Sequence, residues 1–276
     1  MSPDTAPTPR ADGDDAGPVH VDAAASLRGR AVLVVGCRGR MGAMLCRRGT
    51  AAGLDMRGVD VPLTDAVLAP ACKDAALVLL CVPAAVFADV AATVCAHLPA
   101  TAILADITSV KVRPLQQMEA IWPGPVVGTH PLFGPATPDE DGLPVTVTPG
   151  RTAREEDTAL VEAFFQALGC STFRATADEH DRAMARVQNM NFITNLAYFA
   201  LLAGQEDLLP YITPSFRRRL HAAEKMLTED GTMFTGLFEA NPYSHEAVRQ
   251  YRKMLNVAAA GDIELLCRRA QWWWKK

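Results

Sequence analysis

The sequence predicts an α/β protein, in which a doubly wound parallel sheet is followed by an all-helical segment. The run Ala31-Val-Leu-Val-Val35 is continuously apolar, as in a strand that is buried on both faces. A glycine-rich loop, Gly36 to Gly42, comes directly after it and precedes a helical pattern. Further apolar strands then alternate with helices as far as Arg174, where the strand signals end. This alternation is typical of a parallel sheet with helices on both faces.

Each strand is predicted from a short apolar or alternating run that ends at a turn residue. The predicted strands cover Ala31–Val35, Met56–Val59, Ala76–Val82, Ala102–Ala105, Val126–Val127, Val145–Thr148 and Ser171–Arg174. Apolar residues at helical spacing predict helices between them, over Met41–Ala52, Val86–Leu98, Pro114–Ile121 and Arg154–Leu168.

Beyond Arg174 the sequence shows only helical patterns. Thr176 and Glu179 fit a capping box, which predicts a long helix from there to about Ala203. Further helices are predicted over Pro214–Glu229, Pro242–Ala260 and Asp262–Trp274. The wide apolar faces of these helices indicate burial against a second copy, and we expect a homodimer.

Composition excludes several classes of protein. The 276 residues carry a net charge of -4, and no basic stripe points to nucleic acid. No apolar run reaches the roughly 18 residues that cross a bilayer. The 7 cysteines are odd in number and form no CxxC pair, so we expect a reduced, cytoplasmic protein without a metal site.

The glycine-rich loop has the context of a dinucleotide-binding turn. In the fingerprint G-x-G-x-x-G, Cys37 takes the first position, and Gly39 and Gly42 take the other two. Gly39 lets the backbone approach a pyrophosphate, and Gly42 lets the helix pack closely on the strand. The start of the helix carries partial positive charge for the phosphates. The residues expected to contact the cofactor here are Gly36, Cys37, Arg38, Gly39, Met41 and Gly42.

Asp60 ends the second predicted strand, 18 residues after Gly42. A carboxylate at this place accepts hydrogen bonds from the ribose hydroxyls of NAD and repels a 2′-phosphate, so NAD is the expected cofactor. Val82 and Pro83, at the end of the third strand, are also expected beside it. We therefore expect a tail without order over 1–28, an NAD-binding domain of the Rossmann type over 29–175, and a helical substrate-binding and dimerisation domain over 176–276.

The segment from Gly124 to Pro135 contains the best candidate for a catalytic group. Val126-Val127 predict a buried strand, and the sequence Gly128-Thr-His-Pro131 then predicts that His130 is delivered into a rigid turn. In open α/β sheets, chemistry takes place just beyond the carboxyl ends of the strands.

Four motifs in this order and spacing resemble the prephenate and arogenate dehydrogenases of tyrosine biosynthesis. They are the glycine loop 36–42, Asp106-Ile-Thr-Ser-Val-Lys111, Gly128-Thr-His-Pro-Leu-Phe-Gly-Pro135 and Glu179-His-Asp181. The resemblance extends from about Ala31 to Tyr251. It implies an NAD(P)-binding Rossmann domain, a helical dimerisation domain, and oxidative decarboxylation of prephenate to 4-hydroxyphenylpyruvate.

The resemblance also implies roles for individual residues. His130 is the base that takes the proton of the ring hydroxyl, and Ser109 is the serine that orients this histidine. Ser109 could equally be the N-cap of a helix. Thr129, Gln188, Lys225 and Arg217 are the expected substrate contacts. Lys111 has no role that we can assign, and we interpret His180 as a structural residue at the start of a helix.

Two positions depart from the family pattern. Relatives commonly carry a second histidine four residues after the glutamine that matches Gln188, and here that position is Phe192. Relatives also clamp a substrate carboxylate with an arginine about eleven residues after the proline that matches Pro214. Lys225 stands there, which keeps the charge but loses the bidentate fork.

These departures leave alternatives open. The substrate could be arogenate, or the analogue of prephenate with an amine in place of the ring hydroxyl (4-amino-4-deoxyprephenate), which some relatives in antibiotic pathways use. A β-hydroxy acid dehydrogenase would use a lysine base, for which Lys225 is the candidate. A dinucleotide-sensing dimer without turnover is the non-catalytic alternative.

Overall fold

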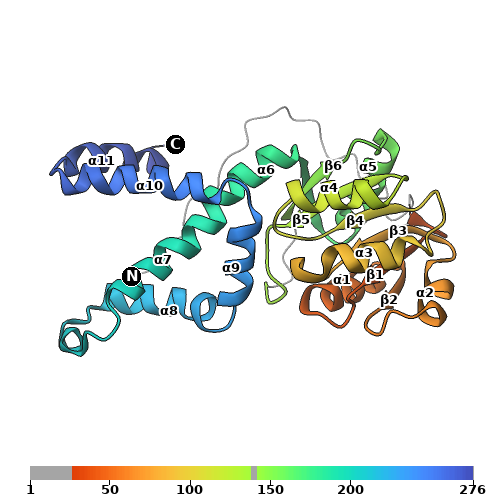
Figure 1. Cartoon of the computed structure of the whole chain (residues 1–276), viewed down its shortest axis with the longest axis horizontal. Helices are drawn as coiled ribbons and strands as arrows, with labels where there is room; N and C mark the ends of the chain where they lie inside the picture. The colour runs from red at the N-terminus through yellow and green to blue at the C-terminus, as the bar shows by residue number, and fades with distance from the viewer. Residues whose placement is uncertain (1–26, 138–141, 276) are drawn as a thin grey trace. The chain divides into compact units, whose positions relative to one another are not determined.

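Strands in the described part of the chain form one sheet with the order β2-β1-β3-β4-β5-β6-β7 (Figure 1). The computed structural model describes residues 27–137 and 142–275. The strands are β1 (Ala31–Val35), β2 (Asp55–Val59), β3 (Ala75–Leu80), β4 (Ile103–Asp106), β5 (Val126–Pro131), β6 (Leu143–Pro149) and β7 (Cys170–Arg174). All neighbouring strands are parallel except β5 and β6. The predicted doubly wound, mostly parallel sheet is therefore confirmed.

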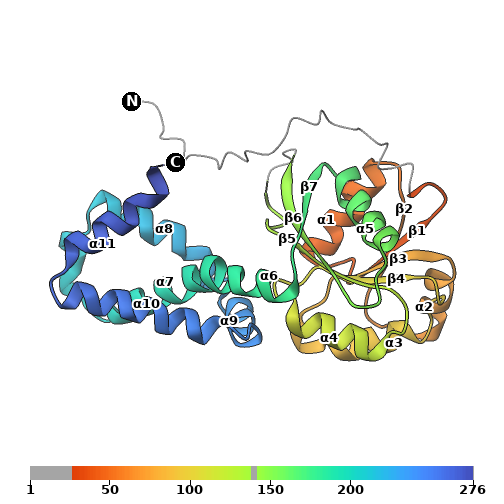
Figure 2. The same ribbon diagram turned by 90° about the horizontal axis from the view of Figure 1, so that it is seen from above.

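Helices cover both faces of the sheet, as Figure 2 shows. One face carries α1 (Arg40–Ala51) and α5 (Glu155–Ala167), which contribute Leu45 and Phe164 to a buried cluster with the strands. The other face carries α2 (Asp65–Cys72), α3 (Phe87–Cys95) and α4 (Val112–Ile121), and its cluster includes Phe87 and Met118. Burial on both faces explains why β1 and β3 read as continuous apolar runs.

The carboxyl ends of β1, β3, β4 and β5 lie at one edge of the sheet because these strands are parallel. The strand order reverses between β1 and β3, where open α/β sheets bind their ligands. The glycine loop follows β1, Val82 and Pro83 follow β3, and Asp106 ends β4. The predicted cofactor loop, the residues after β3 and the end of β4 are thus gathered at this edge.

The predicted turn at His130 is wrong, because β5 continues through His130 to Pro131. Its partner β6 runs antiparallel to it and pairs His130 with Thr146. This pairing extends the strand beyond the two valines from which it was predicted. His130 therefore lies on a strand that has neighbours on both sides, and its backbone is held by the sheet.

The long helix predicted to end near Ala203 is interrupted. It consists of α6 (Ala177–Met184), a π-helical turn over Ala185–Asn189, and α7 (Met190–Leu201). Such turns are often found at functional sites. Here the turn contains Asn189, which is buried and donates a hydrogen bond to Ser244. The apolar period continues across the turn, so the sequence pattern alone does not reveal it.

Helices α8 (Pro214–Thr228), α10 (Ser244–Ala259) and α11 (Ile263–Ala270) agree with the predicted segments to within a few residues. Two short helices were not predicted. Helix α2 contains Pro70, and α9 (Gly231–Ala240) begins with a glycine, so both lack an ordinary start or interior pattern. The described residues also form 3₁₀ segments over Ala84–Val86, Glu206–Tyr211 and Gln271–Trp274.

The described residues divide into two compact units, one that ends at Ser244 and one that begins at His245. The predicted boundary at 175/176 stays a prediction. Of the predicted tail, residues 1–26 lie outside the described part of the chain, while Leu27 is buried in the core. In the part of the chain that the structure describes, no helix combines the length and the apolar character that a membrane crossing requires.

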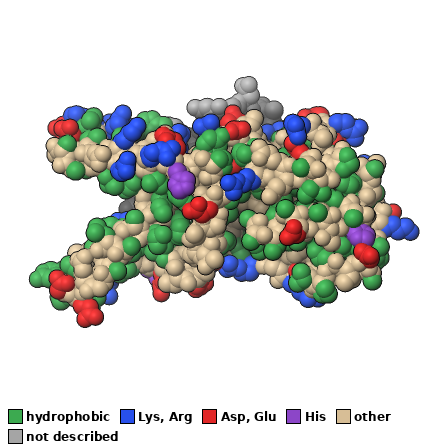
Figure 3. Space-filling view, viewed as in Figure 1, with side chains coloured by type: hydrophobic (Ala, Val, Ile, Leu, Met, Phe, Trp, Pro, Cys, Tyr) green, Lys and Arg blue, Asp and Glu red, His purple; other side chains and the backbone are tan. Residues whose placement is uncertain are grey.

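Several large hydrophobic side chains are exposed in the helical elements that follow the sheet. Figure 3 shows hydrophobic side chains at the surface of this region. Exposed examples are Leu201, Leu209, Tyr211, Leu220 and Met233. Apolar surface of this kind is compatible with the predicted dimer, which stays a prediction.

Candidate active site

The glycine loop has no room for side chains at the points where it turns. Gly36 has a φ of +87°, and a Cβ there would lie 2.5 Å from the carbonyl oxygen of Cys81. A Cβ on Gly42 would lie 2.3 Å from the carbonyl oxygen of Gly36. Gly39 is the N-cap of α1 and offers no capping side chain. The first N–H groups of this helix are therefore available to an anion.

Asp60 is tied to the glycine loop from the end of β2. Its Oδ2 accepts a hydrogen bond of 2.9 Å from the backbone N–H of Arg38, and its Oδ1 accepts one of 2.8 Å from Val61. The carboxylate is thus held between the loop and the strand end, where a ribose is bound in dinucleotide folds. Together with the glycines, this arrangement fits a dinucleotide.

A buried ion pair joins the ends of β4 and β5. The Nζ of Lys111 lies 2.5 Å from Oδ2 of Asp106 and donates a second hydrogen bond, of 2.6 Å, to the carbonyl of Thr129. Both side chains of the pair are inaccessible to solvent. Burial lowers the pKa of Lys111, and the charge of Asp106 opposes that shift. Lys111 therefore has a structural role, since it holds the residue that precedes His130.

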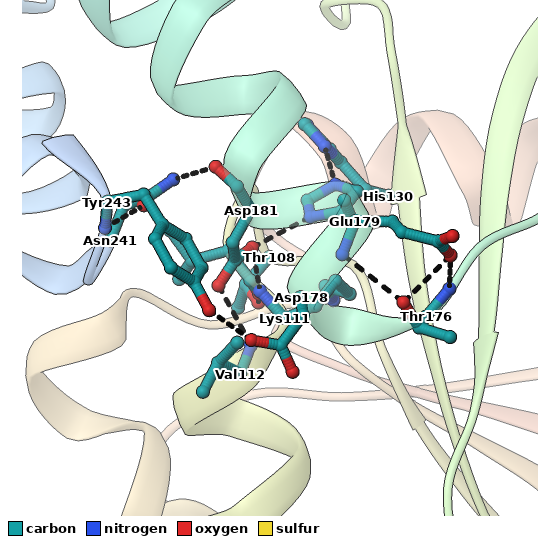
Figure 4. A network of polar contacts seen from close by, with 12 residues as sticks. Thr108, Lys111, Val112, His130, Thr176, Asp178, Glu179, Asp181, Asn241 and Tyr243 are labelled. Atoms are coloured by element: carbon teal, nitrogen blue, oxygen red, sulfur yellow. Dashed lines mark hydrogen bonds and ion pairs between the residues drawn. The ribbon is translucent and has the colours of Figure 1, made fainter. Parts of the chain in front are cut away.

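His130 is the first member of a hydrogen-bonded chain of three side chains (Figure 4). Its Nδ1 lies 2.9 Å from Nε2 of His180, and Nδ1 of His180 lies 2.8 Å from Oδ1 of Asp181. The two imidazole rings meet edge to face, with an interplanar angle of 72°. All three residues are buried, with exposed fractions of 4%, 3% and 0%. No hydrogen bond to Nε2 of His130 is found among the described residues.

Burial keeps both imidazoles neutral near neutral pH. It lowers the pKa of His130 well below 6.5, and the neighbouring His180 and Lys111 add to this shift. Burial also lowers the pKa of His180, although the hydrogen bond to Asp181 works in the opposite direction. A neutral imidazole has a free lone pair and can accept a proton.

Asp181 is anchored to the start of α4. Its Oδ1 and Oδ2 accept hydrogen bonds of 2.7 Å and 2.9 Å from the backbone N–H groups of Lys111 and Val112. The side chain of Asn241 donates to the carbonyl of Asp181, at 2.8 Å. Asp181 thus takes the place of a capping side chain for α4, and it fixes α6 against the sheet edge (Figure 4).

A second contact holds the same corner. Tyr243 donates a hydrogen bond from its hydroxyl to Asp178, and the guanidinium of Arg182 lies 4.0 Å from the centre of the tyrosine ring. Tyr243 follows α9 closely, whereas Asp178 and Arg182 belong to α6. These contacts limit movement of α6 and therefore of His180.

The predicted site residues are not all brought together. Thr129 is buried, and its hydroxyl donates to the carbonyl of Asp106, so its side chain already has a partner. Ser109 has no hydrogen bond to His130 within the described residues, and α4 begins at Val112 with Lys111 as N-cap. The orienting role implied for Ser109 stays a prediction, and its alternative as a helix N-cap is wrong.

Three of the expected substrate contacts lie on the helical elements, and their surroundings differ. Gln188 lies in the π-helical turn, and its buried Oε1 has no hydrogen-bond partner in the described structure. Lys225 is exposed and lies 4.0 Å from Oδ2 of Asp230. Arg217 lies beside an apolar groove of about 540 Å³ between α7 and α8, lined also by Phe199 and Leu220.

Phe192 lies on α7 and is buried. Its ring stacks on Phe234 of α9, with 5.4 Å between ring centres and 18° between planes. The position where the family resemblance implies a histidine is therefore part of a small aromatic contact between two helices.

Two features of the site were not predicted. His180 and Asp181 were recognised as a motif but not as partners of His130, because 50 residues separate the two histidines. The ion pair between Arg40 and Asp230 joins residues 190 apart, and Asp230 belongs to no motif. Among the described residues, no group of three or more metal-binding side chains is found.

Comparison with known proteins identifies the relatives of this chain. Residues 49–172 match the family described as "Prephenate dehydrogenase, nucleotide-binding domain". The chain is 29% identical to the T-protein of Enterobacter agglomerans over 238 residues, which are 84% of this chain and 62% of that protein. It is also 29% identical to the probable arogenate/prephenate dehydrogenase of Methanocaldococcus jannaschii over 184 residues, 66% of this chain and 40% of that one. The chain thus spans less than two thirds of the length of these two relatives.

A solved structure shares the fold. The prephenate dehydrogenase from A. aeolicus, in complex with hydroxyphenyl propionate and NAD+, superposes with a TM-score of 0.70 at 20% identity. The match covers 88% of this chain and 92% of that one. The resemblance inferred from the motifs is confirmed: residues 49–172 match the nucleotide-binding domain of prephenate dehydrogenases, and the chain is similar to a T-protein and to a probable arogenate/prephenate dehydrogenase.

Proposed function

We propose that this protein is an NAD-dependent dehydrogenase that converts prephenate to 4-hydroxyphenylpyruvate by oxidative decarboxylation. The observation that carries the proposal is His130. It is a buried, neutral imidazole on β5, at the same sheet edge as the glycine loop, and its Nε2 has no partner among the described residues.

The residues at the carboxyl ends of β1 and β2 fit NAD. Gly36 and Gly42 allow the tight turn of the loop, and Gly39 leaves the first N–H groups of α1 free for a pyrophosphate. Asp60 would accept hydrogen bonds from the ribose. An aspartate there disfavours a 2′-phosphate, which supports NAD over NADP. When bound, this cofactor would accept the hydride from the ring carbon that carries the hydroxyl.

The protein's own contribution is to move a proton. As the ring hydroxyl becomes a carbonyl, its proton goes to Nε2 of His130. The ring carboxylate then leaves as carbon dioxide, and the electron pair of the broken bond makes the ring aromatic. The resulting phenolate oxygen can take back the proton from His130. A base of this kind accelerates a reaction by roughly 10² to 10⁴.

Positive charge is needed to hold the substrate, which carries two carboxylates. Lys225 is the proposed partner of one of them, because it is exposed near the start of α9 and has only a loose ion pair with Asp230. Gln188 is a second proposed substrate contact, since its buried amide oxygen lacks a hydrogen bond that a ligand could provide.

We also propose that the protein acts in the cytoplasm as a homodimer. The cysteines are free thiols, as expected in a reducing compartment, and large hydrophobic side chains are exposed on the helices that follow the sheet. Sedimentation of the full chain over a range of concentrations would measure the oligomeric state.

The test is NADH formation, followed by absorbance, with the purified full chain. Prephenate, arogenate and 4-amino-4-deoxyprephenate are each offered with NAD and with NADP. We expect turnover with prephenate and NAD. His130→Asn should reduce turnover by roughly 10² to 10⁴ while leaving the NAD affinity unchanged. Turnover with another of the three substrates alone would reassign the substrate, and an active His130→Asn variant would exclude the proposed base.

A further inference from the structure

We propose that His180 and Asp181 are positioning residues that fix the tautomer of His130, so that its Nδ1 carries the proton and its Nε2 stays free as the base. The inference rests on the proposed function only for the role of that base. The direction of the hydrogen bonds follows from the structure and can be measured without any substrate.

The direction is set at the Asp181 end of the chain. Both carboxylate oxygens of Asp181 face backbone donors, the N–H groups of Lys111 and Val112. A carboxylate whose two oxygens both accept hydrogen bonds from backbone N–H groups acts as an acceptor. The contact of 2.8 Å with His180 must therefore be a donation from Nδ1–H of His180 to Oδ1 of Asp181.

The direction of the hydrogen bond between His130 and His180 follows from the neutral state of His180. A neutral imidazole carries one proton, and on His180 that proton is on Nδ1. Its Nε2 consequently has a lone pair and accepts the hydrogen bond of 2.9 Å from Nδ1 of His130. His130 must then carry its own single proton on Nδ1, which leaves Nε2 unprotonated.

This order has a consequence for catalysis. When Nε2 of His130 takes a proton, the imidazolium donates a stronger hydrogen bond to His180, whose other nitrogen is bonded to a negative charge. The charged and titratable groups around the pair are Asp181 on α6, Lys111 at the start of α4 and Asp106 at the end of β4. Asp181 is the acid that lies in line with the two rings, while Lys111 is paired with Asp106.

A structural role alone would not need this arrangement. Two buried histidines could pack with either tautomer, provided that each polar atom has a partner. Here, the anchored carboxylate of Asp181 allows one direction of donation only. The same logic operates in the serine proteases, where replacing the orienting aspartate by asparagine selects the wrong tautomer and lowers kcat by about 10⁴.

The experiment combines histidine ¹⁵N spectra of the full chain with steady-state kinetics. The wild-type His130 resonance, assigned with His130→Asn, should show a protonated Nδ1 and an unprotonated Nε2. In Asp181→Asn the direction of the two hydrogen bonds should reverse, so that His130 carries its proton on Nε2. The kcat of this variant should fall by about 10³ to 10⁴.

Because Asp181 also caps α4, two variants of His180 test the same point without disturbing that cap. His180→Leu should lower kcat about 100-fold or more, the range in which a positioned base contributes. The glutamine in His180→Gln can still accept a hydrogen bond from His130 and donate one to Asp181. The kcat of this variant should therefore be at least tenfold higher than that of His180→Leu. The NAD affinity should stay within about twofold of wild type in both variants, because neither residue contacts the loop. His97→Gln is the matched control, because His97 pairs with Asp65 and is far from His180 in the sequence.

Several results would overturn the proposal. One is a wild-type His130 with its proton on Nε2, and another is wild-type kcat in His180→Leu. Equal losses in the leucine and glutamine variants, with unchanged His130 resonances, would also overturn it. If instead the enzyme shows no turnover with any of the three substrates, the proposed function fails, while the ¹⁵N spectra still decide the direction of the hydrogen bonds.

Discussion

Asp230 accepts a hydrogen bond of 2.9 Å from Arg40, although 190 residues separate the two in the sequence. Arg40 lies within the glycine loop and is the first residue of α1, and Asp230 is the N-cap of α9. The other carboxylate oxygen of Asp230 lies 4.0 Å from Nζ of Lys225. One carboxylate therefore connects the candidate cofactor loop to the lysine that is proposed to bind substrate.

Removing that carboxylate should strengthen substrate binding. In Asp230→Asn, Lys225 loses a competing negative partner and the substrate dianion loses a repelling charge. We expect KM for prephenate to fall about two- to fivefold, in line with the 0.2–1 kcal/mol of exposed ion pairs. KM is measured at low and high ionic strength, since screening should remove the effect. Glu229→Gln changes the same net charge at the neighbouring position, and an equal fall in KM there would contradict the specific role of Asp230.

Lys225 itself should control substrate affinity. Lys225→Ala removes a charged hydrogen bond worth about 1.5–3 kcal/mol, so KM for prephenate should rise roughly 10- to 150-fold with a smaller change in kcat. Lys225→Arg restores the planar fork and should keep KM near wild type or below it. Arg217→Ala is the comparison, because Arg217 lies beside the apolar groove. A large rise in KM for that variant alone would move the carboxylate clamp to Arg217.

The buried pair of Lys111 and Asp106 should be essential for stability. Lys111→Met would leave the Asp106 carboxylate buried without its cation, and Oδ1 of Asp106 already lacks a hydrogen bond in the described structure. We expect the free energy of unfolding to fall by about 3–5 kcal/mol, measured by denaturation in urea. Lys73→Met, at an exposed lysine after α2, should change it by less than about 0.5 kcal/mol. If Lys111→Met lowered the free energy of unfolding by as little as Lys73→Met, the fold would not depend on Lys111.

The sequence could predict most of the elements because their signals are local. The apolar runs of β1 and β3 and the glycine loop after β1 each lie within a few residues, and β1 has the predicted bounds. The fold class and the glycine loop were accessible in this way. His130 was also found from sequence, although its place inside β5 was not, because strand β6 extends β5 from the other side.

What the sequence could not predict depends on contacts between distant segments. The π-helical turn at Ala185–Asn189 does not change the apolar period, and the partner of Asn189 is Ser244, 55 residues later. Similarly, nothing near Asp181 indicates that it accepts from the start of α4, 69 and 70 residues away. The roles of His180 and Asp181 became visible only when the fold placed α6 against the edge of the sheet.

The glycine loop offers a prediction for cofactor binding. Gly42→Ala would place a Cβ 2.3 Å from the carbonyl oxygen of Gly36 and 3.0 and 3.1 Å from two further backbone atoms, none of which can move cheaply. The loop must shift, and we expect NAD affinity to fall at least about tenfold, an effect of 1.4 kcal/mol or more. Isothermal titration with NAD measures it. Gly236→Ala, in α9 with open space around it, should leave NAD affinity unchanged and stabilise that helix by about 0.5–1 kcal/mol. Equal NAD affinities in the two variants would refute the steric argument.

The two buried histidines should make the fold sensitive to acid. The pKa of His130 and that of His180 are lowered from 6.5 in the folded protein, while both return to ordinary values on unfolding. As the pH falls below about 6.5, the unfolded chain therefore takes up protons that the folded chain does not, and the free energy of unfolding decreases. Above that pH neither state is protonated at these sites, and the contribution is constant.

Denaturation in urea at pH 7.5 and at pH 5.5 measures this loss of stability. Each unit by which a pKa is lowered contributes at most about 1.4 kcal/mol, and this maximum is reached only once the pH lies below the folded pKa. His130→Asn and His180→Gln should each reduce the difference between the two pH values, because each removes one of the groups that protonate on unfolding. His221→Gln serves as control, since that side chain is 90% exposed, and it should lose as much stability as wild type. If the wild-type protein were equally stable at both pH values, the buried imidazoles could not be neutral by burial, and the free lone pair on His130 would lose its physical basis.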